Sequence, residues 1–253
     1  MNTDIKSFLI SLYIWGFLCI TIIPLFLLFA FIWIVLFPFD HNKIVTHHYT
    51  ALWARLYLAV NPWWKISIEN KQKIRRNTPY ILISNHQSIL DVALLLQLYI
   101  RFRWVSKIEL VGVPVLGWVI RMNKHIVVRR GDKQSIVQMA QACKRSLSEG
   151  ISIFMFPEGT RSEDGTLKPF KDGAFILAKE NGVTILPVLL DGASTALPRK
   201  SFFFRGRQHF RINVLDEITN ETISKFTLEE LIGHTWEIMT GGLEKMHQDN
   251  YNI

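Results

Sequence analysis

Beyond residue 65 the chain alternates between short apolar, β-branched runs and longer stretches with helical periodicity. The short runs predict strands at 66–69, 80–84, 103–106, 125–129, 151–156, 184–190 and 209–215. The longer stretches predict helices near 88–100, 114–123, 133–149, 172–181 and 227–247. This alternation indicates an α/β domain whose mixed, largely parallel sheet is flanked by helices. In such sheets, sites form where the carboxyl ends of strands meet the N-termini of helices.

Two of the predicted helices carry signals for their ends. Gly150 follows the helical pattern of 133–149 and predicts its stop, because glycine readily adopts the left-handed conformation that ends a helix. Thr227 and Glu230 stand three residues apart at the start of 227–247, which is the spacing of a capping box.

The N-terminal part of the chain has a different pattern. From Ser7 to Phe39 no residue is charged, and the run is longer than the roughly 20 apolar residues that a membrane-spanning helix needs. Pro24 interrupts it, which predicts either a kinked helix or two arms that re-enter from one side. Residues 40–60 then predict an amphipathic helix with aromatic residues favoured at a bilayer surface.

These patterns divide the chain into a membrane-anchoring helical segment, residues 1–64, and an α/β domain, residues 65–253. Basic residues follow the anchor closely, namely Lys71, Lys73, Arg75 and Arg76. Because positive charge favours the cytoplasmic side, we expect a membrane protein, in the inner or cytoplasmic membrane, whose main domain faces the cytoplasm.

Composition narrows the class of partner. The formal net charge is +8 and the isoelectric point is about 9.5, which predicts an anionic partner such as phospholipid, nucleic acid or a phosphorylated substrate. The two cysteines lie in unrelated segments, so a disulfide framework is not expected. No Cys/His cluster has zinc-ligand spacing, so we expect no metal.

The stretch from Pro79 to Asp91, PYILISNHQSILD, joins a predicted strand to a predicted helix and carries His86. His86 and Asp91 can meet only if His86 precedes the helix and Asp91 lies in its first turn. A carboxylate on one ring nitrogen would fix the tautomer and leave the other nitrogen to accept a proton. The alternative is a histidine that caps the helix and an aspartate that complements its dipole. Ser88 is interpreted as a helix-capping hydroxyl rather than a nucleophile.

A second polar cluster follows the predicted strand 151–156. Gly159 allows a sharp turn, Arg161 offers a planar fork suited to phosphate, and Glu158 is placed to bind a hydroxyl or to orient that arginine. The alternative is an ordinary turn with a surface Glu–Arg pair.

Taken together, NHQSILD at 85–91 and FPEGTRS at 156–162 resemble the motifs of the 1-acylglycerol-3-phosphate acyltransferase family. The segments KIELVGVPVLG at 107–117, HIVVRRGD at 125–132 and ILPVLLDG at 185–192 resemble further blocks of that family, in the same order. Two positions depart from its pattern: Lys124 replaces a frequent glycine and Arg129 a frequent acidic residue. Both add positive charge, which leaves the preferred headgroup open.

The resemblance implies an O-acyltransferase that moves a fatty acyl group from acyl-CoA or acyl carrier protein to the free hydroxyl of lysophosphatidic acid, giving phosphatidic acid in phospholipid biosynthesis. It implies that His86 is the base and that Asp91 orients it. It implies further that Arg161, Arg130 and Lys107 hold the acceptor's phosphate, that Glu158 binds near its glycerol, and that Gly159 and Thr160 shape the loop. The thioester is then a substrate, no cofactor is expected, and the bilayer is the partner.

The sequence alone leaves other functions possible. The acceptor could be a lyso-ornithine lipid or another lysophospholipid, or the chain could be a catalytically inactive membrane lipid-binding protein. The segment 199–211, five cations interleaved with four phenylalanines, suits an anionic bilayer, a hairpin with partly buried Phe202–Phe204, or base stacking. Because the chain already carries a membrane anchor, no nucleic-acid partner is expected.

Overall fold

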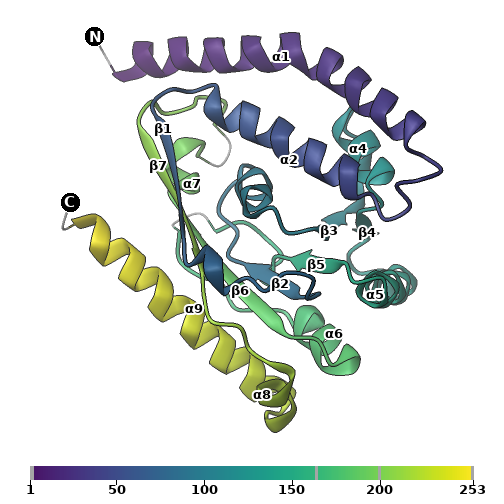
Figure 1. Cartoon of the computed structure of the whole chain (residues 1–253). Helices are drawn as coiled ribbons and strands as arrows, with labels where there is room; N and C mark the ends of the chain where they lie inside the picture. The colour runs from purple at the N-terminus through teal and green to yellow at the C-terminus, as the bar shows by residue number, and fades with distance from the viewer. Residues whose placement is uncertain (1–2, 163–164, 199–200, 252–253) are drawn as a thin grey trace.

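The computed structural model describes residues 3–162, 165–198 and 201–251, and it confirms the predicted fold class. One sheet has the strand order β1-β7-β6-β2-β5-β3-β4 (Figure 1). Neighbouring strands are parallel except for the antiparallel pair β6–β7. The strands are β1 (Trp64–Glu69), β2 (Ile81–Ser84), β3 (Phe102–Lys107), β4 (Ile126–Val128), β5 (Ser152–Met155), β6 (Ile185–Asp191) and β7 (Gln208–Val214).

Helices cover both faces of this sheet, which explains why its central strands are continuously apolar. Successive side chains of β2 alternate between two hydrophobic clusters: Leu82 belongs to one, and Ile81 and Ile83 to the other. The first cluster includes residues of α2 (Ile44–Ala59) and α3 (Asp91–Leu95). The second includes residues of α5 (Lys133–Ser148), α6 (Gly173–Asn181) and α9 (Leu228–Tyr251).

The helix predicted at 88–100 is shorter than expected. It consists of α3 and the 3-10 helix η2 (Leu96–Leu98), and the chain before Asp91 is a loop. The carboxylate of Asp91 accepts the backbone N–H groups of Gln87 and Ser88, which holds these residues outside the helix. Helix α4 (Leu116–Met122) lies within its predicted range. Four further helices were not predicted, because they are too short to produce a periodic sequence pattern: η1 (Lys71–Lys73), η3 (Ile108–Gly112), α7 (Ala193–Ala196) and α8 (Asn220–Lys225).

Both predicted helix ends are confirmed. The N–H of Thr227 donates to Glu230 Oε2 at 2.8 Å, and the N–H of Glu230 donates to Thr227 Oγ1 at 3.3 Å, which is a reciprocal capping box. Gly150 has a φ of 71° two residues after the end of α5. That left-handed conformation lets the chain turn directly into β5.

The N-terminal run forms one helix, α1 (Thr3–Val35), with Pro24 inside it. Re-entry of its two arms from one side of a membrane stays a prediction. The helix changes direction along its length (Figure 1), as a proline inside a helix leads one to expect. Within Ile5–Val35, the most apolar 18-residue window has a mean hydropathy of 2.9, and only 6% of that window is buried. By length and composition this helix is able to cross a membrane, although a signal sequence would pass the same test.

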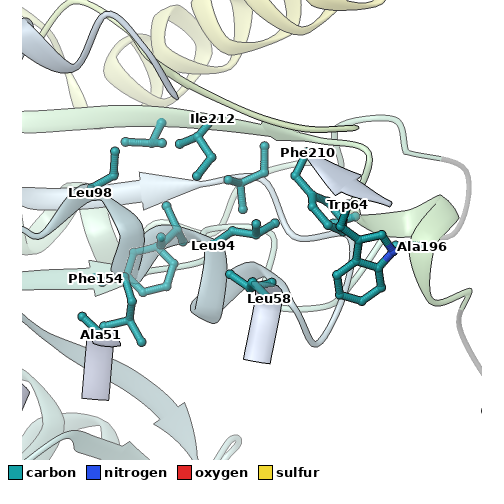
Figure 2. Packing of buried hydrophobic residues seen from close by; sticks show 14 of the residues in the cluster. Ala51, Leu58, Trp64, Leu94, Leu98, Phe154, Ala196, Phe210 and Ile212 are labelled. Carbon is teal, nitrogen blue, oxygen red and sulfur yellow. The ribbon is translucent and has the colours of Figure 1, made fainter. Parts of the chain in front are cut away.

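Helices α1 and α2 also pack against the α/β domain. Ile10 and Ile14 of α1 and Ala51 and Leu58 of α2 share a core cluster with residues of the sheet. Figure 2 shows Ala51 and Leu58 beside Leu94 and Phe154, with Trp64, Phe210 and Ala196 at one end of the same cluster. The division into two domains at residue 64 therefore stays a prediction.

The basic aromatic segment before β7 lies against α1. Phe204 is buried, and its N–H donates to Ser11 Oγ at 2.7 Å. Trp15 Nε1 donates to the carbonyl of Phe202, whereas the side chains of Phe202 and Phe203 are 75% and 51% exposed. Arg199 and Lys200 lie outside the described residues. Of the three aromatic rings predicted to enter the core partly, only that of Phe204 does.

Asn85 fixes the chain at the carboxyl end of β2. Its side chain is buried, and it forms two hydrogen bonds of 2.8 Å with the backbone of Leu190 in β6, donating to the carbonyl and accepting from the N–H. Through these bonds the Asn85 side chain continues the pairing between β2 and β6 beyond the last residue of β2. They also fix the position of the next residue, His86.

We therefore expect Asn85→Leu to lower the free energy of unfolding by about 2–4 kcal/mol, because it leaves two buried backbone groups of Leu190 without partners. For a chain of this size, that change corresponds to a fall in Tm of about 5–10 °C. Thermal unfolding in detergent measures it. Gln134→Leu, on the exposed face of α5, is the control and should change Tm little. Equal Tm values for Asn85→Leu and the parent would contradict this role.

Candidate active site

Four neighbouring strands end in a row at one edge of the sheet. The strands β2, β5, β3 and β4 are adjacent and parallel, so their carboxyl ends lie at the same edge. His86 follows β2, Glu158 follows β5, Lys107 ends β3 and Arg130 follows β4. The fold thus gathers residues that are widely separated in the sequence, as expected for a largely parallel sheet.

His86 and Asp91 meet as the sequence predicted. His86 Nδ1 and Asp91 Oδ2 are 2.7 Å apart, His86 lies before α3, and Asp91 is the first residue of that helix. The same Oδ2 accepts the backbone N–H groups of Gln87 and Ser88 at 2.7 and 2.8 Å, and Asp91 is fully buried. Since a carboxylate only accepts hydrogen bonds, His86 donates from Nδ1–H. The neutral ring therefore carries a lone pair on Nε2.

Packing fixes the plane of the His86 ring. The ring stacks on Phe156 with centroids 3.8 Å apart and an interplanar angle of 14°. The His86 side chain keeps 20% of its surface exposed, and Nε2 forms no hydrogen bond with any residue in the described part of the chain. The nitrogen opposite Asp91 is thus the one able to accept a proton from a bound molecule.

The interpretation of Ser88 as the helix cap is wrong. The residue before α3 is Leu90, and no side chain caps it. Ser88 is buried, and its Oγ only accepts a long bond of 3.4 Å from the N–H of Leu90. The carboxylate of Asp91 instead accepts the backbone N–H groups of residues 87 and 88, which lie before the helix.

Glu158 connects the loop after β2 with the loop after β5 by hydrogen bonds. Its Oε1 accepts the backbone N–H of His86 at 2.7 Å, and its Oε2 accepts that of Lys168 at 3.1 Å. The N–H of Ser162 in turn donates to the carbonyl of His86 at 2.7 Å. Glu158 is only 4% exposed, and this burial raises the pKa of its carboxyl from 4.5 to about 7, although the two backbone hydrogen bonds oppose the shift.

The loop after Glu158 has the sharp turn that its glycine predicts. Gly159 has a φ of 70°, and its carbonyl accepts a hydrogen bond from the guanidinium of Arg130. A Cβ at this position would lie 3.0 Å from Lys171 Cε. Thr160 is exposed, and its role in shaping the loop stays a prediction.

Positive side chains gather beside this loop. The pKa of Lys107 is lowered, first by burial of its amine and then by the positive charges of Arg130, Arg161 and Lys171, which outweigh Glu109. We call Lys107, Arg130, Arg161 and Lys171 the cation cluster. The structure thus brings together the three cations that the sequence assigned to phosphate.

Lys171 is the member that the sequence did not reveal. Its N–H donates to the carbonyl of Pro157 at 2.9 Å, which returns the chain to the motif loop. Nothing in the local pattern distinguishes Lys171 from other lysines of the chain, so only the course of the loop identifies it. Among the residues that the structure describes, no group of three or more His, Cys, Asp or Glu side chains is arranged to hold a metal ion.

The chain is similar in sequence to known acyltransferases. The model of the family described as Acyltransferase matches residues 65–191. A chloroplast 1-acyl-sn-glycerol-3-phosphate acyltransferase of Arabidopsis thaliana is 39% identical over 165 residues, which are 64% of this chain and 46% of that protein. A 1-acyl-sn-glycerol-3-phosphate acyltransferase of Chlamydomonas reinhardtii is 32% identical over 191 residues, which are 75% of this chain and 56% of that protein.

The chain thus spans about half the length of these curated relatives. The fold is also found in the crystal structure of a 1-acyl-sn-glycerophosphate acyltransferase from Thermotoga maritima, with a TM-score of 0.81. That likeness covers 97% of this chain and 98% of the other at 22% identity. From the family match over residues 65–191, the chain belongs to the acyltransferase family.

Proposed function

We propose that this protein transfers a fatty acyl group from a thioester to the free hydroxyl of 1-acylglycerol-3-phosphate, giving phosphatidic acid for phospholipid biosynthesis. The observation that carries the proposal is the 2.7 Å contact between His86 Nδ1 and Asp91 Oδ2. It leaves Nε2 of His86 without a hydrogen bond to any described residue, at the edge of the sheet where the cation cluster lies. Relatives named 1-acyl-sn-glycerol-3-phosphate acyltransferase support the choice of acceptor.

The reaction follows from the orientation of His86. Nε2 accepts the proton of the acceptor hydroxyl while its oxygen attacks the thioester carbonyl, and Asp91 stabilises the imidazolium that forms. The tetrahedral intermediate collapses by breaking the C–S bond, and the imidazolium returns its proton to the leaving thiolate. The acyl group moves directly between substrates, without a covalent acyl-enzyme. This accords with a sequence that has no GxSxG nucleophile elbow.

The cation cluster gives the acceptor its orientation. A phosphate carries several acceptor oxygens, which suit the planar guanidinium groups of Arg130 and Arg161 and the amines of Lys107 and Lys171. Binding the phosphate there would present the glycerol hydroxyl to His86. An acceptor without this phosphate, such as a lyso-ornithine lipid, would lose these contacts with the cation cluster. Either acyl-CoA or acyl carrier protein would serve as the donor.

The substrates place the reaction at a membrane. The long apolar helix α1 and the exposed rings of Phe202 and Phe203, in the segment that contacts it, support attachment to a bilayer. We propose that the α/β domain stays on the cytoplasmic side, because basic residues follow the two helices.

The test of this function follows thiol release from a long-chain acyl-CoA by the purified protein with lysophosphatidic acid. The parent should release thiol only when the acceptor is present and should form phosphatidic acid. His86→Ala should lower the rate about 10²–10⁴-fold, because it removes the general base. His41→Ala, an exposed histidine in the turn between α1 and α2, is the matched control and should retain the parent rate.

Acceptors and donors in the same assay separate the alternatives. Monoacylglycerol, which lacks the phosphate, should react much more slowly than lysophosphatidic acid. Turnover with acyl carrier protein or with a lyso-ornithine lipid alone would keep the mechanism and change the substrate. If no thioester reacts with any lyso-acceptor, the chain is a lipid-binding protein and the proposed function is wrong.

We propose a second role for Glu158, as a positioning residue that acts through the backbone of His86. The charged carboxylate accepts the N–H groups of both His86 and Lys168, whereas a protonated carboxyl or an amide points a donor at one of them. Glu158→Gln should therefore lower kcat about 5–100-fold with little change in KM, as expected when a buried donor loses its acceptor.

The pH profile distinguishes this role from substrate binding. With a pKa of about 7, Glu158 becomes protonated as the pH falls through neutrality. The parent's kcat should therefore fall as the pH drops through neutrality, and Glu158→Gln should lose the part of this acid limb that follows the Glu158 carboxyl. Glu244→Gln, an exposed glutamate on α9, is the control. An unchanged limb with a raised KM would instead indicate that Glu158 binds substrate.

A further inference from the structure

A cavity of about 810 Å³ lies at the edge of the sheet opposite to the candidate active site. We call it the rear cavity. Its walls come from the start of α2, the chain between β1 and β2, the chain between α3 and β3, and the turn before β5. The lining residues are Ile44, His48, Lys71, Gln72, Ile74, Arg75, Arg76, Asn77, Thr78, Leu98, Tyr99, Ile100, Arg101, Gly150 and Ser152.

Strand direction separates this cavity from the catalytic edge. Arg76 and Thr78 precede β2, whereas His86 follows it. Gly150 precedes β5, whereas Glu158 follows it. Four-residue strands such as these span about 13 Å at roughly 3.3 Å per residue. A ligand held by the cations of the rear cavity is therefore distinct from one held by the cation cluster at His86.

The rear cavity is strongly positive. Lys71, Arg75, Arg76 and Arg101 line it, and none of the described lining residues is acidic. Arg75 is paired with Glu217. Lys71 and Arg101 contact carbonyl oxygens instead, those of Gln97 and Gly150, at 3.4 and 3.1 Å. Three positive charges therefore face one cavity without a carboxylate among its lining residues.

Part of the lining of the rear cavity is apolar and includes a strained aromatic residue. Ile44, Ile74, Leu98 and Ile100 supply the apolar surface. Tyr99 has a φ of 58°, a left-handed conformation that bulky residues rarely adopt, and Lys71 Nζ lies 5.2 Å from the centre of its ring. Such strain persists where the surrounding structure enforces it, and it clusters at functional sites.

We propose that the rear cavity is a second binding site, for a phosphate-bearing ligand, remote from the acyl-transfer chemistry. A phosphate offers several acceptor oxygens to two guanidinium forks and one amine. A cavity of this size also accommodates the organic part of the ligand against the isoleucines and the ring of Tyr99. The phosphate comes either from a soluble phosphate ester or from a phospholipid headgroup.

The test measures ligand binding by calorimetry on the full chain in detergent, with two probes. Inorganic pyrophosphate represents the soluble source, and dihexanoylphosphatidylglycerol represents the lipid headgroup. Lys71→Gln combined with Arg76→Gln removes two exposed cations of the cavity. Lys144→Gln combined with Lys245→Gln removes two exposed cations elsewhere, on α5 and α9, and is the matched control. Arg130→Gln with Arg161→Gln removes binding at the candidate active site.

We expect the cavity variant to bind at least one probe about 10- to 100-fold more weakly than the parent, because two charge-assisted contacts are lost. The control should bind like the parent, and one binding event should persist in Arg130→Gln/Arg161→Gln. Tighter binding of the lipid probe than of pyrophosphate identifies a headgroup, and the reverse identifies a soluble phosphate. Equal weakening in the control variant, loss of all binding in Arg130→Gln/Arg161→Gln, or no binding of either probe by the parent would overturn the proposal.

Discussion

The candidate active site depends on a single oxygen atom, Oδ2 of Asp91. It accepts the ring N–H of His86 and the backbone N–H groups of Gln87 and Ser88, all within 2.8 Å, in a fully buried position. By accepting these three hydrogen bonds, Oδ2 keeps residues 87 and 88 out of the helix. It also orients the imidazole and keeps the proton of the neutral ring on Nδ1. Because the carboxylate belongs to the first residue of α3, the start of the helix fixes where His86 points.

The parallel sheet turns this local arrangement into a site. Adjacent strands of one direction bring the residues that follow β2, β5 and β4 to one edge, so His86, Glu158 and Arg130 lie at that edge although they are far apart in the sequence. The same topology brings a second set of cations, Lys71, Arg76 and Arg101, to the opposite edge. The positively charged side chains of this protein are thus concentrated in two separate regions, the cation cluster and the rear cavity.

Much of this arrangement could be predicted from the sequence, because strands and motif loops have local signals. The seven strand positions and the His86–Asp91 contact followed from periodicity and spacing. The contacts of Glu158 could not be predicted, since its partners are backbone amides that only the folded loops bring near. Lys171 and the rear cavity were missed for the same reason: they depend on how loops return to the sheet, and loop courses have no periodic pattern.

The most direct test of the account is the tautomer of His86, read from the ring nitrogen signals of the protein with isotope-labelled histidine. His86→Ala identifies the signals. We predict that the neutral ring carries its proton on Nδ1, held by Asp91, and has its lone pair on Nε2. We expect this preference to weaken in Asp91→Asn. A neutral His86 with its proton on Nε2 in the parent would leave no base facing the acceptor and would contradict the account.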